Sequence, residues 1–251
     1  MNGIVDIGWG SMCLGFLLLL IPVTALAYYR TGLVKDTLIA ASRMTLQLFL
    51  IGFYLEYLFT WNSAWINLLW ASWTVLGRTK LPVKQLFIPV IVAFFCSICI
   101  IDVYFLGIII KLDHLFEARY FVPVSGMILG NMLSANVIAL NVFYGSLDRE
   151  RQLYFYLLVN GATRGEATAP FMREALIKSF NPTIASMAVM GLVALPGTMT
   201  GQILGGSSPN VAIKYQIMLM ITIFSSSLIS VLLTLWAAKR RSFDSWGIKR
   251  F

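Results

Sequence analysis

The sequence predicts an all-α integral membrane protein with about seven transmembrane helices. Of its 251 residues, 59% are hydrophobic and only 12% are charged, whereas ordinary soluble domains carry roughly 25% charged residues. The mean hydropathy is +0.80. Apolar stretches recur along the chain at the length of about 20 residues that crosses a hydrocarbon core. We therefore expect a single multi-pass domain over residues 1–251 in the cell (inner or plasma) membrane.

The first four spans are predicted near 10–29, 37–59, 64–77 and 86–110. Pro22 is expected to kink the first helix, because proline removes one ladder hydrogen bond. The third segment is short and barely crosses a core of roughly 30 Å at about 1.5 Å per residue. We retain this third span because without it the basic loop at 78–84 would lie on the opposite side of the membrane from the other basic loops.

The last three spans are predicted near 120–144, 183–204 and 211–238. With seven spans, one side of the membrane receives the basic segments 30–35, 78–84, 146–182 and 239–241. By the positive-inside rule this side is cytoplasmic, which places the N-terminus outside and the C-terminus inside. The net charge of +8 is explained by these short loops, so nucleic acid is not an expected partner.

A charged insert at 146–182 separates the fifth span from the sixth. A helix is expected to continue out of the membrane through 149–159 and to stop at Asn160-Gly161, a pair suited to a helix C-terminus. A second helix is expected to start near Thr168, with Pro170 in its first turn, and to end before Pro182. The pattern fits a solvated helical hairpin without a partner, and it equally fits a handle for a soluble protein.

The segment LLVNGATRGEATAPFMREALIKSFNPTIAS resembles the coupling loop of ATP-binding-cassette permeases. In that family a Gly and a small residue sit between two short cytoplasmic helices, which insert into a groove of the ATPase subunit. The resemblance implies a role in ATPase coupling for Asn160, Gly161, Ala162, Thr163, Arg164, Glu166 and Phe171. The importer motif begins with Glu-Ala-Ala six residues before the Gly, where this chain has Phe155, Tyr156 and Leu157. That departure argues against a standard importer.

The segments MGLVALPGTMTGQILGGSSPNVAIKYQIMLM, PVSGMILGNML and RMTLQLFLIGFYLEYLF resemble the FetB family of iron-export permeases. The resemblance covers nearly the whole chain. It implies a homodimeric permease that exports iron or another metal and is driven by two copies of a separate ATPase subunit. Plant relatives are linked to aluminium tolerance and to sugar-nucleotide transport, so an exporter of a sugar nucleotide or another metabolite stays open. An ATPase-independent channel or secondary carrier is the alternative from a different class.

The sequence contains neither a GxxxxGK[ST] phosphate-binding loop nor an LSGGQ-like signature. Nothing in it is therefore expected to cradle ATP phosphates through backbone N–H groups. We expect this chain to be a transport subunit rather than an enzyme and to have no cofactor of its own. ATP and Mg are expected on the partner ATPase.

Polar and sulfur-bearing side chains inside the spans are the candidates for the substrate pathway. A charge in the bilayer core costs about 2.5–3.5 kcal/mol on insertion scales, so Arg43 and Glu56 are expected near an interface, paired or facing water. Thioethers suit soft metals and amides orient ligands, although both also fill helix packing. The predicted pathway comprises Glu56, Met127, Asn131, Met199, Gln202 and Gln216, with Glu56, Met127 and Met199 as metal candidates.

Two further groups of residues complete the predictions. The fourth predicted span carries three possible metal ligands at three-residue spacing along one helical face, namely Cys96, Cys99 and Asp102. The alternative for the two thiols is a role as small apolar packing groups. Pro196 and Gly197 fall in the middle of the sixth predicted span. Because proline removes a hydrogen bond and glycine adds freedom, the pair is predicted to form a kink or a gate.

Overall fold

The computed structural model describes residues 8–61, 118–192 and 195–241, together with isolated positions between 92 and 107. Among these residues every secondary-structure element is a helix, which confirms the all-α class. In the part of the chain that the structure describes, three segments are long and apolar enough to cross a membrane, namely Gly10–Tyr28, Tyr120–Arg149 and Pro209–Arg240. The predicted third span and most of the fourth lie outside the described residues, so the seven-span count and the orientation stay predictions.

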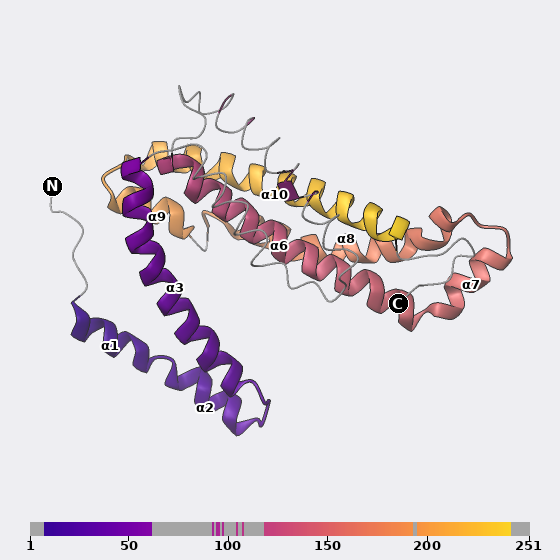
Figure 1. The fold of residues 1–251 in the computed structure, drawn as a ribbon, viewed down its shortest axis with the longest axis horizontal. Helices are drawn as coiled ribbons and strands as arrows, with labels where there is room; N and C mark the ends of the chain where they lie inside the picture. Colours follow the sequence, from indigo (N-terminus) through magenta and orange to yellow (C-terminus); the bar gives the residue numbers. More distant parts are fainter. Residues whose placement is uncertain are drawn as a thin grey trace. The chain divides into compact units, whose positions relative to one another are not determined.

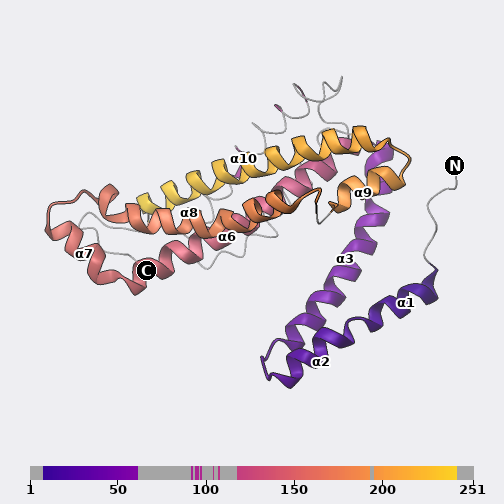
Figure 2. The ribbon, with the colours of Figure 1, turned by 180° about the vertical axis from the view of Figure 1, so that it is seen from behind.

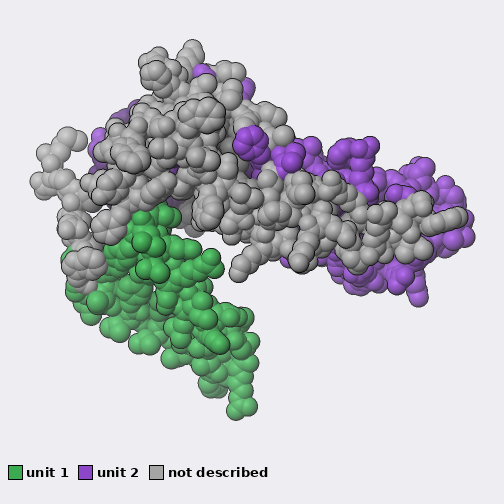
Figure 3. Space-filling view, in the orientation of Figure 1, with its two compact units in different colours: residues 1–61 green, residues 62–251 purple. Residues whose placement is uncertain are grey.

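The first of two compact units comprises residues 1–61 (Figure 3). Its helices are α1 (Trp9–Leu17), α2 (Leu20–Tyr28) and α3 (Val34–Trp61). The disturbance predicted at Pro22 is present as a break between α1 and α2. Proline has no N–H to give to the Leu18 carbonyl, which accepts from the Ile21 N–H at 3.2 Å instead.

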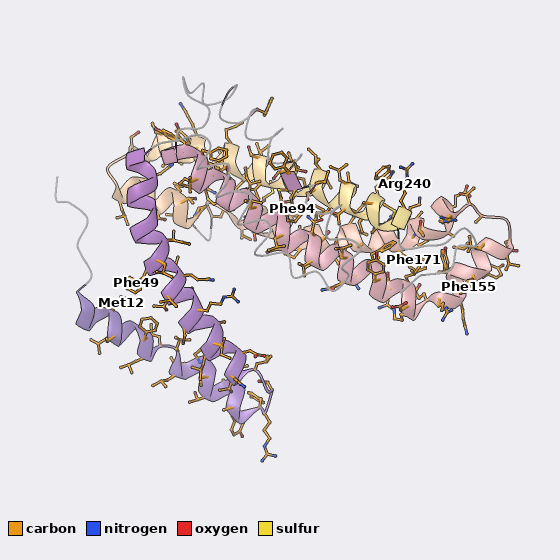
Figure 4. The ribbon with its side chains drawn as sticks, viewed as in Figure 1. Met12, Phe49, Phe94, Phe155, Phe171 and Arg240 are labelled. Atoms are coloured by element: carbon orange, nitrogen blue, oxygen red, sulfur yellow. The ribbon has the colours of Figure 1, made fainter. Side chains whose placement is uncertain are left out.

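The first unit is rich in exposed apolar side chains. No position between Gly10 and Tyr28 is buried within the structure, as suits a helix that is surrounded by lipid. Met12 of α1 and Phe49 of α3 help to line an apolar cavity of about 500 Å³ (Figure 4). The predicted second span is confirmed as helical over its whole length by α3.

The second unit contains the charged insert and the last spans. Its described helices are α6 (Ala118–Arg149), α7 (Arg151–Val159), α8 (Arg164–Val189), α9 (Gly197–Leu204) and α10 (Pro209–Arg241). Helix α6 packs along both α8 and α10, and both views show the three helices side by side (Figures 1 and 2). The fully buried core includes Ile128, Met132 and Phe143 of α6 with Val231 and Leu235 of α10. Spacings of four and eleven along α6 and of four along α10 place these side chains on one face of each helix.

The helices of the charged insert differ from their predicted bounds. The helix leaving the fifth span is interrupted at Glu150, where φ is −110° and ψ is 38°. Helix α8 begins at Arg164 rather than near Thr168, and it continues through Pro170 and Pro182 to Val189. The predicted stop before Pro182 is therefore wrong. Proline removes one ladder hydrogen bond, and the packing of α8 along α6 holds the helix together across that gap.

The predicted single helix over 183–204 is also wrong. Helix α8 ends at Val189, Met190 is extended with ψ 132°, and α9 begins only at Gly197. Gly191 has φ 85° and Pro196 has ψ 142°, and neither conformation continues a right-handed helix. Pro196 and Gly197 therefore lie at the start of a separate short helix, and not inside a continuous one.

Candidate functional site

The charged insert folds into a hairpin of α7 and the first turns of α8, which we call the α7–α8 hairpin (residues 151–171). Helix α7 ends at the Asn-Gly pair, as predicted. The Ala162 N–H donates to the Leu157 carbonyl and the Gly161 N–H to the Leu158 carbonyl, each at 3.0 Å. Gly161 has φ 89°. This is a Schellman motif, in which a residue without Cβ takes the left-handed position.

The start of α8 is closed by a reciprocal capping box. The Glu166 N–H donates to Thr163 Oγ1 at 3.3 Å, and the Thr163 N–H donates to Glu166 Oε2 at 2.7 Å. The Thr163 hydroxyl also donates to Glu166 Oε2. The bonds from the Thr163 hydroxyl and N–H to this carboxylate hold the pKa of Glu166 below its usual value. With the Schellman motif on one side and the capping box on the other, the turn around Ala162 has a defined backbone.

An aromatic pair lies beneath the turn. Tyr154 of α7 and Phe171 of α8 are 3% and 1% exposed, and their ring centroids are 6.4 Å apart at an interplanar angle of 62°. Figure 4 shows Phe171 inside the helical packing. Phe171 was predicted as a coupling residue, and the structure places it in the packing between α7 and α8; its part in coupling stays a prediction.

The outer face of α7 carries exposed apolar side chains that the sequence reasoning did not single out. Val159 is 87% exposed, Tyr156 65% and Leu153 40%. Their three-residue spacing places them on the face of α7 that turns away from buried Tyr154, and this spacing was the signal in the sequence. An apolar strip on a hairpin that is otherwise rich in charge is typical of a protein contact surface.

Two contacts, one beside the hairpin and one within it, connect this region to the long helices. Arg149 at the end of α6 lies 3.3 Å from Glu174 of α8, and Lys178 lies 2.7 Å from the same carboxylate oxygen. The Lys178 ammonium and the Arg149 guanidinium, in that order, hold the pKa of Glu174 below its usual value. A Cβ on Gly165 would lie 3.1 Å from Lys239 Nζ, so the end of α10 meets the first turn of α8 at a glycine.

The break between α8 and α9 brings together part of the predicted pathway. Gln216 of α10 is only 7% exposed, and its carbonyl accepts from the Thr198 hydroxyl of α9. Its amide nitrogen lies 3.9 Å from the Met190 sulfur at the end of α8. Met199 is buried on α9, and Gln202 is half-buried one turn further. The amide of Gln216 therefore contacts the end of α8 and the start of α9, on either side of the break between them.

The other predicted pathway residues are not shown to join this cluster. The Asn131 amide is exposed and donates to the Met127 carbonyl of its own helix at 2.8 Å. Glu56 belongs to α3, and its side chain lies outside the described part of the structure, as do Cys96, Cys99 and Asp102. Among the described residues no group of three or more His, Cys, Asp or Glu side chains could hold a metal ion.

Long apolar helices joined by a charged hairpin define a multi-pass helical membrane protein. The chain matches UPF0014, described as an uncharacterised protein family, over residues 9–243, and it belongs to that family. No solved structure matches the chain.

Three relatives illustrate the family. The chain is 31% identical to the UPF0014 membrane protein slr1647 of Synechocystis, over 95% of this chain and 93% of the relative. It is 28% identical to the probable iron export permease protein FetB of Escherichia coli, over 94% of this chain and 92% of the relative. It is 32% identical to the protein ALUMINUM SENSITIVE 3 of Arabidopsis thaliana, over 74% and 69%. These matches confirm the resemblance seen in the sequence.

Proposed function

We propose that this protein is the permease subunit of an ATP-binding-cassette transporter that exports iron or another metal ion. A separate ATPase subunit binds the α7–α8 hairpin and supplies the energy. The permease acts as a homodimer with two copies of the ATPase, and the hairpin lies on the cytoplasmic side.

The α7–α8 hairpin is the observation that carries this proposal. Its turn is held by a Schellman motif and a capping box, while Val159 and Tyr156 remain exposed at its tip. A preordered apolar tip loses little conformational freedom on docking. The hairpin is also joined directly to the long helices, because α8 continues from it without interruption to Val189.

The metal substrate is supported by the name of one relative, the probable iron export permease FetB. In this chain the pathway is assigned to the break between α8 and α9, where Gln216 and Met199 lie. Transporter sites are commonly built at interrupted helices, where backbone groups become free for a ligand. Amide and thioether groups at such a break suit a metal ion that keeps part of its own ligand shell.

The test is a pull-down of the tagged chain co-expressed with candidate ATPase subunits from its own genome. Val159→Arg is the docking variant, because a side chain that is 87% exposed can change without disturbing the fold. Ser207→Arg is the matched control, since Ser207 is also exposed and lies in the turn between α9 and α10. We expect the wild type and Ser207→Arg to retain an ATP-hydrolysing complex, and Val159→Arg to lose it.

Two results would count against the proposal. If the wild type recovers no ATPase, the chain works as a channel or carrier without one. If the complex forms and its ATPase activity is stimulated by a sugar nucleotide rather than by ferrous iron or another metal, the coupling role stands and the metal substrate is wrong.

A further inference from the structure

A line of buried polar side chains lies between α6 and α10. We call it the polar seam and define it as Asn136 of α6 with Ser227, Ser230 and Thr234 of α10. Their exposed fractions are 0%, 4%, 0% and 1%. The α10 members are three and four residues apart and therefore share one helix face. Both helices are long and apolar enough to cross a membrane, so the seam lies inside the part that lipid surrounds.

The orientation of the Asn136 amide follows from its bonds. Its nitrogen donates to the Met132 carbonyl at 2.8 Å and to Ser230 Oγ at 2.9 Å. A flipped amide would place two oxygens against each other at the Met132 carbonyl, so the nitrogen assignment is secure. Both amide protons are used, and the Oδ1 atom of Asn136 needs a donor from elsewhere.

Three oxygens of the seam have no partner. Within the described structure Asn136 Oδ1, Ser227 Oγ and Thr234 Oγ1 are buried and make no hydrogen bond. Buried polar side chains almost always find a protein group or an ordered water. Lipid supplies neither donors nor acceptors in its hydrocarbon region. The three oxygens therefore indicate a small polar ligand inside the helix pair.

The spacing of the seam fits water. At 1.5 Å of rise per residue, Ser227 and Ser230 are about 4.5 Å apart along the axis, and Ser230 and Thr234 about 6 Å. A water molecule that bonds two groups at about 2.8 Å each joins oxygens up to roughly 5.6 Å apart. Since Asn136 bonds to Ser230, its Oδ1 lies near the middle level. Both gaps have polar atoms at their ends. The shorter gap, about 4.5 Å, has a length that one water spans, whereas the longer gap, about 6 Å, exceeds that length and fits a chain of two waters.

We infer that the polar seam binds ordered water, one molecule between the Ser227 and Asn136 levels and a short chain of water between the Asn136 and Thr234 levels. Amide and hydroxyl groups are neutral and serve a water as both donors and acceptors. The seam has neither a carboxylate nor a thioether among its members, and it shares no residue with the pathway assigned above to the break between α8 and α9. The inference does not depend on the transport function.

The experiment is hydroxyl-radical footprinting by X-ray radiolysis of the purified chain, in which radicals formed from bound water modify the side chains that touch it. Met132 is the reporter, because it is 0% exposed and its carbonyl accepts from Asn136. A variant in which all four polar side chains of the seam are replaced by apolar ones is called the sealed variant. It carries Asn136→Leu, Ser227→Ala, Ser230→Ala and Thr234→Val. We expect Met132 modification to fall several-fold in the sealed variant. Phe121, 2% exposed near the other end of α6, should react equally in both proteins.

A second, milder variant is used in case the sealed variant does not fold. Ser227→Ala with Thr234→Val removes two unpartnered oxygens and keeps the bond between Asn136 and Ser230, so it is expected to fold and to lower Met132 modification. Equal modification in wild type and in a folded variant would overturn the inference. So would modification that changes when choline replaces sodium and potassium, because that result would assign the seam to a cation.

Discussion

Replacing Thr163 by alanine tests whether the capping box keeps the hairpin ordered. Thr163 Oγ1 accepts from the Glu166 N–H at the start of α8, and a lost Thr cap typically costs about 1 kcal/mol. With RT near 0.59 kcal/mol, that loss should raise the open fraction of the first turn by a factor of about five. Thr163→Ser keeps a hydroxyl in the same place and is the matched control.

The assay is amide hydrogen exchange of the peptide around 160–170, followed by mass spectrometry. We expect exchange in Thr163→Ala to be about five times faster than in Thr163→Ser. Peptides from α10 should be unchanged in both variants. Equal exchange in the two variants would refute the reasoning, because it would mean that tertiary packing alone holds the turn.

A pH series checks the other half of the capping box. The folded pKa of Glu166 is lowered by the Thr163 hydroxyl and N–H, so its contribution is complete above the ordinary Glu pKa. It is lost as the pH falls through the lowered folded pKa. Exchange at the turn, expressed relative to the intrinsic exchange rate at each pH, should therefore rise on acidification in the wild type. Glu166→Gln should remove most of that dependence because the amide cannot titrate. A wild-type profile that stays flat through this range would contradict the assignment.

The remaining predictions concern the break and the orientation. Gln216→Leu should reduce transport-coupled ATP hydrolysis without loss of expression. Thr198→Val should cause a smaller loss, because it removes only the hydrogen bond between the two side chains, whereas Gln216→Leu also removes the amide contact with Met190. Equal effects would show that this one hydrogen bond accounts for the role of Gln216. Pro196→Ala should lower turnover while expression is retained, whereas unchanged turnover would leave Pro196 a packing turn. In a cysteine-free background, an impermeant thiol reagent applied to intact cells should label Ser207→Cys and spare Val159→Cys, and the reverse pattern would invert the predicted orientation.

The local features of the hairpin were largely predictable from the sequence. The Asn-Gly stop was found because glycine is the residue that takes the left-handed position at low cost. The start of α8 was placed too late, although Thr163 and Glu166 form a visible capping-box pattern in the sequence. The predicted end of this helix was wrong, because Pro182 was expected to stop a helix that continues past it.

Contacts between distant segments were not predictable in the same way. The pairing of Tyr154 with Phe171, or of Gln216 with Thr198, depends on how helices pack and not on local spacing. The break after Val189 had a local signal in Gly191 and Pro196. Hydropathy over 183–204 obscured it, because an apolar segment scores the same whether its helix is continuous or divided.

The unbroken course of α8 gives the hairpin a mechanical property. With 26 residues, α8 is about 39 Å long, and its first turns belong to the hairpin. A tilt of about 5° at one end would carry the other end by roughly 3 Å at that length. Its far end stops at Met190, against the amide of Gln216. A small displacement of the hairpin would thus be carried along one continuous helix to the point where the helical backbone ends.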